Sequence, residues 1–206
     1  ALEHTRKAFA LLPPVDRPRI LDIGCGQGLQ TMELARLGGG EVVGIDIDET
    51  ALTRFQQRLE PSDVSSRITV RRCSLFDSGL PDESFNILWE EGVLHLLEPA
   101  RSFAACSRLL VPGGFLVMHE TLEWFEAASQ RLPDWGLVFV DRHLLPKHFW
   151  WTEYGAPLED RIRAFRESHG GAAGSPELTR YANEAAMIKA DPDCFDCGFF
   201  ILQKRR

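Results

Sequence analysis

Short hydrophobic runs alternate with longer amphipathic segments along the first 120 residues. Strand-like runs of aliphatic and β-branched residues occur at 19–23, 41–45, 67–71, 85–89 and 115–119. Helical spacing of apolar residues follows at 28–37, before three glycines, and at 99–110, which begins with a proline and ends before Pro112-Gly113-Gly114. This alternation predicts an α/β fold in which helices cover both faces of a mostly parallel sheet.

The pattern is weaker beyond residue 121. A short helix rich in Trp and Phe is expected first, and a strand at 137–140 follows it. Helical segments at 158–168 and 176–189 flank a glycine-rich stretch at 170–174, and a closing strand is predicted at 198–203. Because no linker is long enough to separate two domains, we predict one domain over residues 1–206.

Charge and composition narrow the classes of function. The chain has 206 residues with 30 acidic and 23 basic side chains, which give a net charge of −7. A negative net charge disfavours binding to the phosphates of nucleic acids. The longest nearly uncharged apolar run, 113–118, is far short of the ~20 residues that a membrane span needs. Five cysteines suggest no disulfide framework, and the CxxC at 194–197 lacks a second pair with metal-ligand spacing. We therefore expect a cytoplasmic protein with no metal, nucleic acid or membrane as partner.

The strongest local signal is DIGCGQG at 22–28, where a hydrophobic strand meets a turn with Gly24, Gly26 and Gly28 and a helix follows directly. Glycines remove side chains from this turn, and the new helix offers unpaired N–H groups, so a nucleotide-like ligand can lie close to the backbone. A tight turn without a ligand is the alternative, because glycine triplets are common.

A second signal lies on the next predicted strand. That strand ends at Asp46, 22 positions after Gly24, and an acid at this offset can accept hydrogen bonds from ribose hydroxyls. Its charge would repel a 2′-phosphate, so an adenosine with a free ribose is favoured. A solvated Asp at a strand end is the alternative.

The dinucleotide fingerprint requires glycine at position 29, where this chain has Leu29. The GxGxG form preceded by Asp22 instead resembles the first motif of the class I S-adenosylmethionine-dependent methyltransferases. LPDESFN at 80–86 and RLLVPGG at 108–114 resemble that family's segments leading into the fourth and fifth strands. The resemblance covers residues 19–120, and it implies a Rossmann-like, doubly wound, mostly parallel seven-stranded sheet whose last strand is antiparallel.

The resemblance also implies different roles for the two halves of the chain. Residues 1–121 would form the cofactor-binding half, and 122–206 the substrate-side elements and closing strands. S-adenosylmethionine would be the methyl donor, with Asp22 near its methionyl amino group, Asp46 on the ribose and Ile47 against the adenine. Its remaining contacts would come from the turn and from the loop after the third strand, through Gly24, Cys25, Gly26, Gly28, Ser74 and Leu75. Ser74 stands where the family often has an acid, and Asp77 is a competing choice for that role.

Candidate catalytic groups follow the fourth strand. We predict that Glu90 lines the cofactor and methyl pocket, with His95 and Glu91 as candidate bases or substrate anchors. His119 and Glu120 end the fifth strand at the same edge and are weaker candidates. For His95 the alternative is a half-buried residue without a catalytic role, because it stands between two leucines.

The leading functional prediction is therefore a methyltransferase that uses S-adenosylmethionine and a small-molecule acceptor. A nicotinamide-dependent oxidoreductase and a non-catalytic S-adenosylmethionine-binding protein are the alternatives. Methyl transfer is an in-line displacement in which alignment supplies much of the rate, so a dedicated base is optional.

Overall fold

The computed structural model describes residues 2–168 and 175–206, which form two compact units. The first unit contains the chain up to Glu120, together with Trp124–His143 and Phe199–Arg206. The second unit contains Thr121–Glu123 and Leu144–Gly198. The glycine-rich stretch expected at 170–174 lies outside the described residues.

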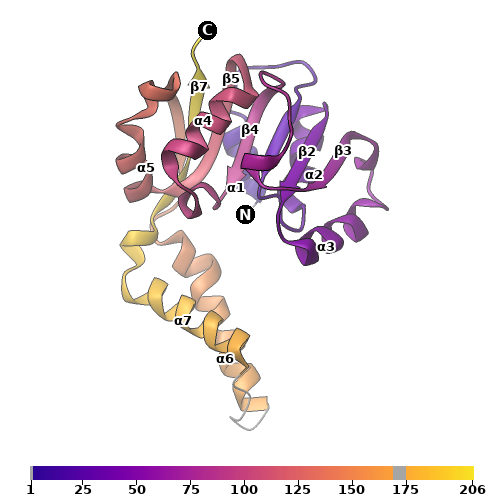
Figure 1. Cartoon of the computed structure of the whole chain (residues 1–206). Coiled ribbons are helices and arrows are strands. Elements are labelled where there is room, and N and C mark those ends of the chain that lie inside the picture. The colour runs from indigo at the N-terminus through magenta and orange to yellow at the C-terminus, as the bar shows by residue number, and fades with distance from the viewer. Residues whose placement is uncertain (1, 169–174) are drawn as a thin grey trace. The chain divides into compact units, whose positions relative to one another are not determined.

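A seven-stranded sheet organises the chain, in the order β3-β2-β1-β4-β5-β7-β6 (Figure 1). β1 pairs in parallel with β2 and β4, β2 pairs in parallel with β3, and β4 pairs in parallel with β5. The strands are β1 (Ile20–Ile23), β2 (Val42–Asp46), β3 (Ile68–Arg72), β4 (Phe85–Glu91), β5 (Leu110–Thr121), β6 (Leu137–Leu144) and β7 (Cys197–Lys204). All seven overlap the strands predicted from hydrophobic runs, although β4, β5, β6 and β7 are longer.

β7 runs antiparallel to its neighbours. The Arg205 N–H donates to Gly136 O just before β6, while the Leu145 N–H just after β6 donates to Cys197 O at the start of β7. The side chain of Lys204 at the end of β7 donates to the carbonyl of Leu110 at the start of β5. The predicted mostly parallel, doubly wound seven-stranded sheet with an antiparallel last strand is therefore confirmed.

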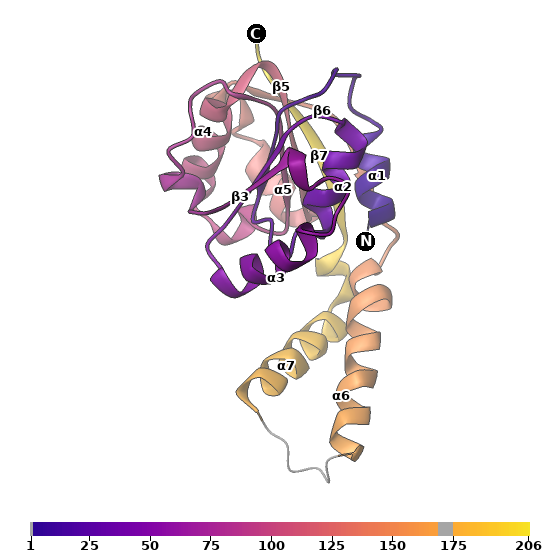
Figure 2. The same cartoon turned by 90° about the vertical axis from the view of Figure 1, so that its right-hand side faces the viewer.

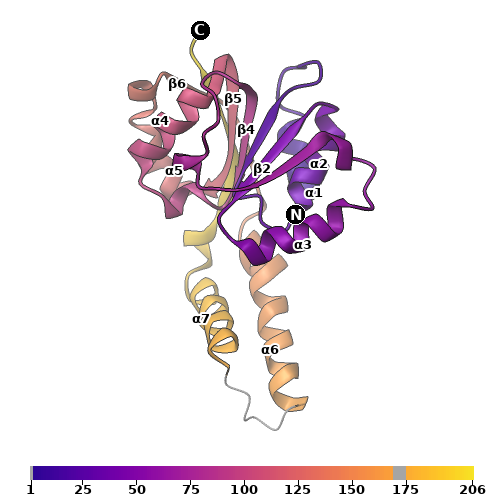
Figure 3. The same cartoon turned by 45° about the vertical axis from the view of Figure 1, so that its right-hand side comes forward.

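Helices cover both faces of the sheet (Figure 3). α1 (Leu2–Phe9), α2 (Leu29–Gly38) and α3 (Glu49–Leu59) lie on one face, and α4 (Pro99–Leu109) and α5 (Leu122–Ser129) lie on the other. Left-handed Gly28 and Gly39 bound α2, as expected for glycine at helix ends. Asp48 begins α3 by accepting hydrogen bonds from the N–H groups of Thr50 and Ala51. Large side chains fill the core between the layers, including Phe55, Phe85, Trp89, Phe103, Phe199 and Phe200.

The second unit is helical. α6 (Ala156–Ser168) and α7 (Pro176–Ala190) pack together and against a π-helical turn at Trp151–Gly155 (Figure 2). Ile162 and Ile188 are buried, and the Lys189 Nζ donates to the Glu159 carboxylate at 2.9 Å. Both helices were predicted, and α6 begins two residues earlier than expected. No helix in the described ranges is long and apolar enough to cross a membrane.

Candidate functional site

The glycine-rich turn after β1 adopts a conformation that only glycine takes readily. Gly24, Gly26 and Gly28 have φ angles of 72°, 51° and 78°. The N–H groups of Gly24 and Cys25 both donate to Ile45 O, at 2.8 and 3.0 Å, and so fix the turn against the end of β2. Cys25 is buried beside Gly44 of that strand.

The three glycines serve two purposes. A side chain on Gly24 would collide with Val93, and one on Gly28 would collide with the ring of Phe55. A Cβ on Gly26 would meet nothing nearer than the carbonyl oxygen of Gly24, 4.0 Å away. Gly24 and Gly28 therefore allow close internal packing, and Gly26 is the glycine with open space above its backbone.

Asp46 joins the turn to the end of β2. Its Oδ2 accepts from the Gly26 N–H at 2.8 Å, and its Oδ1 accepts from the Asp48 N–H at 2.9 Å. Each carboxylate oxygen has about two lone-pair sites, so the group is oriented and still able to accept further bonds. Ile47, the next residue, is 70% exposed, which is unusual for so large an aliphatic side chain.

Asp22 lies beneath the turn, buried on the face covered by α2. The Thr31 hydroxyl of α2 donates to its Oδ2 at 2.6 Å. Burial raises the pKa of Asp22 to about 7, and the charges of Glu91 and Asp46 add to this shift while the Thr31 bond opposes it. A positively charged ligand group nearby would relieve the cost of ionising this buried carboxyl.

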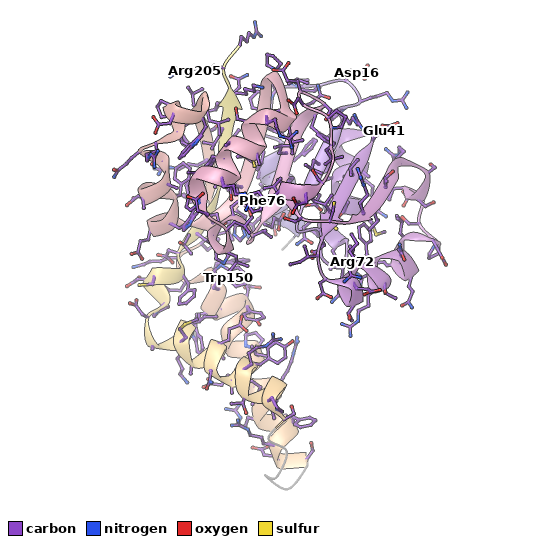
Figure 4. All side chains as sticks on the ribbon, viewed as in Figure 1. Asp16, Glu41, Arg72, Phe76, Trp150 and Arg205 are labelled. Atoms are coloured by element: carbon purple, nitrogen blue, oxygen red, sulfur yellow. The ribbon has the colours of Figure 1, made fainter. Side chains whose placement is uncertain are left out.

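The loop after β3 contains Ser74 and Leu75. The Ser74 Oγ accepts from the Phe76 N–H at 3.2 Å and begins a short helical turn, Leu75–Asp77. Leu75 is buried, and the guanidinium of Arg101 lies over the Phe76 ring, 3.9 Å from its centre. Figure 4 labels Phe76, together with Arg72 at the end of β3. The adenine contacts of Ser74 and Leu75 remain predictions.

Glu90 is the most unusual carboxyl of the site. It is fully buried, and its Oε2 accepts from the N–H groups of Val93 and Leu94 at 2.9 and 3.3 Å. Its Oε1 has no hydrogen-bond partner among the described residues. Burial, followed by the charge of Glu120, raises the pKa of Glu90 well above its usual range. An orphaned buried acceptor in such a position is a place where a ligand or a proton belongs.

His95 and Glu120 form a close pair. His95 lies in the turn Leu94–Leu96 after β4, and Glu120 stands near the end of β5. The carboxylate accepts from the His95 backbone N–H at 3.0 Å and contacts its ring Nδ1 at 2.9 Å. Glu120 was among the weaker candidates from sequence, although its place at the end of the strand next to β4 was the available signal.

Glu91 and His119 lie on the opposite face of the sheet. Glu91 accepts from Thr5 of α1, Gln30 of α2 and the indole of Trp89, at 2.9, 3.2 and 2.9 Å, so it ties both helices to β4. Burial raises its pKa. His119 stacks on Phe199, and burial lowers its pKa to about 4. Successive strand residues point to opposite faces, so the structure brings Glu90, Glu120 and His95 together but not Glu91 or His119.

Metal ligands do not gather here. Among the side chains that the structure describes, no three His, Cys, Asp or Glu are placed so that they could hold a metal ion.

Comparison with known proteins gives consistent matches. Residues 21–118 match the family described as a methyltransferase domain. A ubiquinone biosynthesis O-methyltransferase from Caulobacter sp. is 30% identical over 184 residues, which cover 84% of this chain and 69% of that protein. The chain spans only 28 to 51% of the length of three other curated relatives that it matches.

Two solved structures share the fold. A putative sarcosine dimethylglycine methyltransferase from Galdieria sulphuraria has a TM-score of 0.80 at 16% identity, covering 99% of this chain and 86% of its own. A methyltransferase from Geobacter sulfurreducens in complex with S-adenosyl-L-homocysteine has a TM-score of 0.76 at 18% identity, covering 100% of this chain and 92% of its own. At such identities the likeness concerns the fold alone.

Proposed function

Because the chain belongs to the family of class I S-adenosylmethionine-dependent methyltransferases, we propose that it binds S-adenosylmethionine and transfers the methyl group to a small-molecule acceptor. The observation that carries the proposal is the joined arrangement of Gly26, Asp46 and Ile47. Gly26 offers open space above its backbone, Asp46 an oriented carboxylate and Ile47 an exposed aliphatic side chain, and all three lie at one edge of the sheet.

In the proposed complex, Asp46 accepts bonds from the ribose hydroxyls, and Ile47 packs against the adenine. Ser74 and the backbone N–H of Leu75 contact the adenine edge. The open space above Gly26 lets the ligand approach the turn that Gly24, Cys25 and Gly28 shape. The carboxylate of Asp46 disfavours a ligand with a 2′-phosphate, since like charges repel.

Two buried carboxyls fit the methionyl end. Asp22 has a raised pKa because it is buried, and a ligand ammonium would stabilise its ionised form. Glu90 offers a carboxyl oxygen that has no partner within the described part of the chain. Glu91, which holds α1 and α2 against β4, supports the same sheet edge from the opposite face.

S-adenosylmethionine supplies a methyl group on a sulfonium, a good leaving group that needs no metal or redox partner. The protein's task is then to hold the acceptor in line with that methyl group and to keep water away. His95 is the candidate group for removing a proton from an acceptor that carries one. The net charge of −7 favours a small molecule over a nucleic acid as acceptor.

Isothermal titration of the purified chain with S-adenosylmethionine and S-adenosylhomocysteine tests the proposal. We expect saturable binding of both, and mass spectrometry of the purified protein is expected to find one of them as a bound ligand. Formation of S-adenosylhomocysteine from a pool of small acceptors would separate an enzyme from a non-catalytic binding protein. Absence of binding, or a change in NADH fluorescence on mixing, would contradict the proposal.

A further inference from the structure

A single buried carboxylate holds His95 at two points. The Oε1 of Glu120 accepts a hydrogen bond from the backbone N–H of His95, and its Oε2 contacts the ring Nδ1. The Glu120 side chain is 2% exposed, whereas that of His95 is 42% exposed. The carboxylate is thus fixed inside the fold, and the imidazole lies at the surface of the first unit. Of the two ring nitrogens, Nδ1 faces Glu120.

The neighbouring carboxyl of Glu90 influences whether Glu120 is protonated or ionised. Glu90 pairs with Met118 in the sheet register, and Glu120 lies two residues further along β5, so both carboxyls stand on the same face of neighbouring strands. Two close buried carboxyls do not both ionise readily. Within the described part of the chain, the hydrogen bonds to Glu90 come from backbone N–H groups, whereas Glu120 also contacts an imidazole. Burial raises the pKa of both carboxyls, that of Glu90 well above its usual range, while the contacts with His95 lower that of Glu120. The carboxyl that retains a proton is therefore Glu90, and Glu120 carries the negative charge.

An ionised Glu120 can only accept hydrogen bonds, so Nδ1 of His95 must carry the ring proton. In a neutral imidazole the other nitrogen, Nε2, is then the acceptor with a free lone pair. This is the tautomer that a general base requires, and a carboxylate behind the ring also stabilises the imidazolium that forms when the base takes up a proton.

The segment that carries His95 is anchored to the glycine-rich turn. Val93 packs into the space that a side chain on Gly24 would occupy, and its N–H is bound by Glu90. His95 follows Val93 by two residues. The backbone that positions the imidazole is therefore fixed by contacts with the same turn that is proposed to hold the cofactor.

We propose that Glu120 is a positioning residue that holds His95 as the general base of the reaction, and that the acceptor accordingly carries a dissociable proton, as a hydroxyl or thiol does. This inference rests on the proposed function. His95 Nε2 takes the acceptor's proton while the acceptor's electron pair forms the bond to the methyl carbon. The electron pair of the broken carbon–sulfur bond stays on sulfur, which becomes a neutral thioether, and the proton later leaves His95 for solvent.

The ionisable groups around the pair lie on β4 and α4. Glu90 of β4 interacts with Glu120 through its charge. On α4, burial and the charge of Glu90 raise the pKa of Cys106. Glu91 acts on Glu90 through its charge from the opposite face.

The first test needs no acceptor. Long-range proton–nitrogen correlation spectra of the whole chain labelled with nitrogen-15 histidine report the tautomer of each imidazole, and His95→Gln identifies the signals of His95. We expect the proton on Nδ1 in the wild type and a shift towards Nε2 in Glu120→Gln, which keeps an acceptor but loses the charge. Glu41→Gln, an exposed acid just before β2, is the matched control and should leave the spectrum of His95 unchanged. A wild-type His95 protonated on Nε2, or a tautomer indifferent to Glu120→Gln, would overturn the proposal.

The second test measures S-adenosylhomocysteine formed with caffeic acid, 2-mercaptoethanol and sarcosine as probes of hydroxyl, thiol and amine acceptors. We expect turnover of a hydroxyl or thiol probe, a fall in kcat of about 100-fold or more in His95→Gln, and a smaller fall in Glu120→Gln with an altered pH profile. The KM for S-adenosylmethionine should not change, and Glu120→Asp should restore part of the kcat. Full turnover with the wild-type pH profile in His95→Gln would show that His95 is not the general base.

The two claims fail in different ways. If the wild type does not bind S-adenosylmethionine in the titration, the proposed function and the base role fall together. If it binds the cofactor but His95 has the other tautomer, the methyltransferase proposal stands and the assignment of His95 and Glu120 is wrong. If only the amine probe is methylated, the inferred hydroxyl or thiol acceptor is wrong. If no probe is turned over, the tautomer measurement decides.

Discussion

The Oδ2 of Asp46 accepts a hydrogen bond from the Gly26 N–H at 2.8 Å. An acid at the end of β2 thereby orients the open backbone of the turn after β1, and the turn in return orients the acid. The two sequence signals that pointed to an adenosine ligand are parts of one hydrogen-bonded unit, so a change in one is expected to disturb the other.

Replacing Asp46 by Ala should therefore weaken binding of S-adenosylmethionine by ~1 to 3 kcal/mol, because the ribose acceptor and the orientation of Gly26 are lost together. Isothermal titration measures this change. Asp16→Ala, an exposed acid in the segment before β1, is the matched control and should bind as the wild type does. An unchanged dissociation constant in Asp46→Ala would exclude Asp46 from the ribose site.

The glycines of the turn should respond differently to the same substitution. Gly24→Ala places a methyl group against Val93 in a left-handed conformation, so a loss of several kcal/mol in the free energy of unfolding is expected, about 1 to 2 of it from the backbone. Gly26→Ala meets open space and should cost only about that backbone term, while its methyl group obstructs the ligand.

Urea unfolding and cofactor titration distinguish the two positions. Adding Val93→Ala to Gly24→Ala should recover part of the lost stability, whereas adding it to Gly26→Ala should not. Equal losses of stability at Gly24 and Gly26, with no recovery, would show that packing against Val93 is not what requires glycine at 24.

Cofactor binding should depend on pH through Asp22. The pKa of this group is raised to about 7, so it is largely protonated below that value in the free protein. Affinity for a ligand ammonium is therefore expected to rise as the pH increases through 7. Titrations between about pH 5.5 and 7.5 measure the trend, and Asp22→Asn should flatten it. A trend that persists in Asp22→Asn must come from another group.

The same group has the opposite effect on folding. Its ordinary pKa is 3.8, so between there and about 7 the unfolded chain releases a proton that the folded chain retains. The contribution of Asp22 to the free energy of unfolding therefore falls as the pH rises across this interval. Comparing urea unfolding of wild type and Asp22→Asn at several pH values isolates this contribution.

Glu91 should matter for stability more than for turnover. Glu91→Ala leaves the donors of Thr5, Gln30 and Trp89 without their acceptor, at an expected cost of about 2 to 4 kcal/mol in the free energy of unfolding. Glu91→Gln, which keeps one acceptor oxygen, should cost less. If Glu91→Gln instead has the same free energy of unfolding as the wild type but abolishes methyl transfer, Glu91 is a catalytic group, as its position in the sequence first indicated.

The parts of the site that sequence could predict are local in the chain. The strand, the glycines and the first turn of α2 follow one another directly, and Asp46 ends the next hydrophobic run. The separation of Glu90 from Glu91 was also predictable, because residues in a strand alternate between faces. Both were expected near the methyl group because of their position along the strand, although their side chains point in opposite directions.

The rest depends on long-range contacts. Glu120 meets His95 only because β5 lies beside β4, and no local pattern marks that hydrogen bond. α1 was not predicted, since its buried side chains are few and polar contacts hold it in place, including Thr5 with Glu91 and Arg6 with Glu33. Contacts of this kind appear only when the sheet order is known.

The packing of Val93 against Gly24 also constrains how such a chain can diverge. An acquired side chain at 24 would require a smaller residue at 93, so the two positions are expected to change as a pair rather than one at a time. Selection for a new acceptor can then alter the exposed Leu96 freely, but it reaches position 93 only at the expense of the packing against the glycine-rich turn.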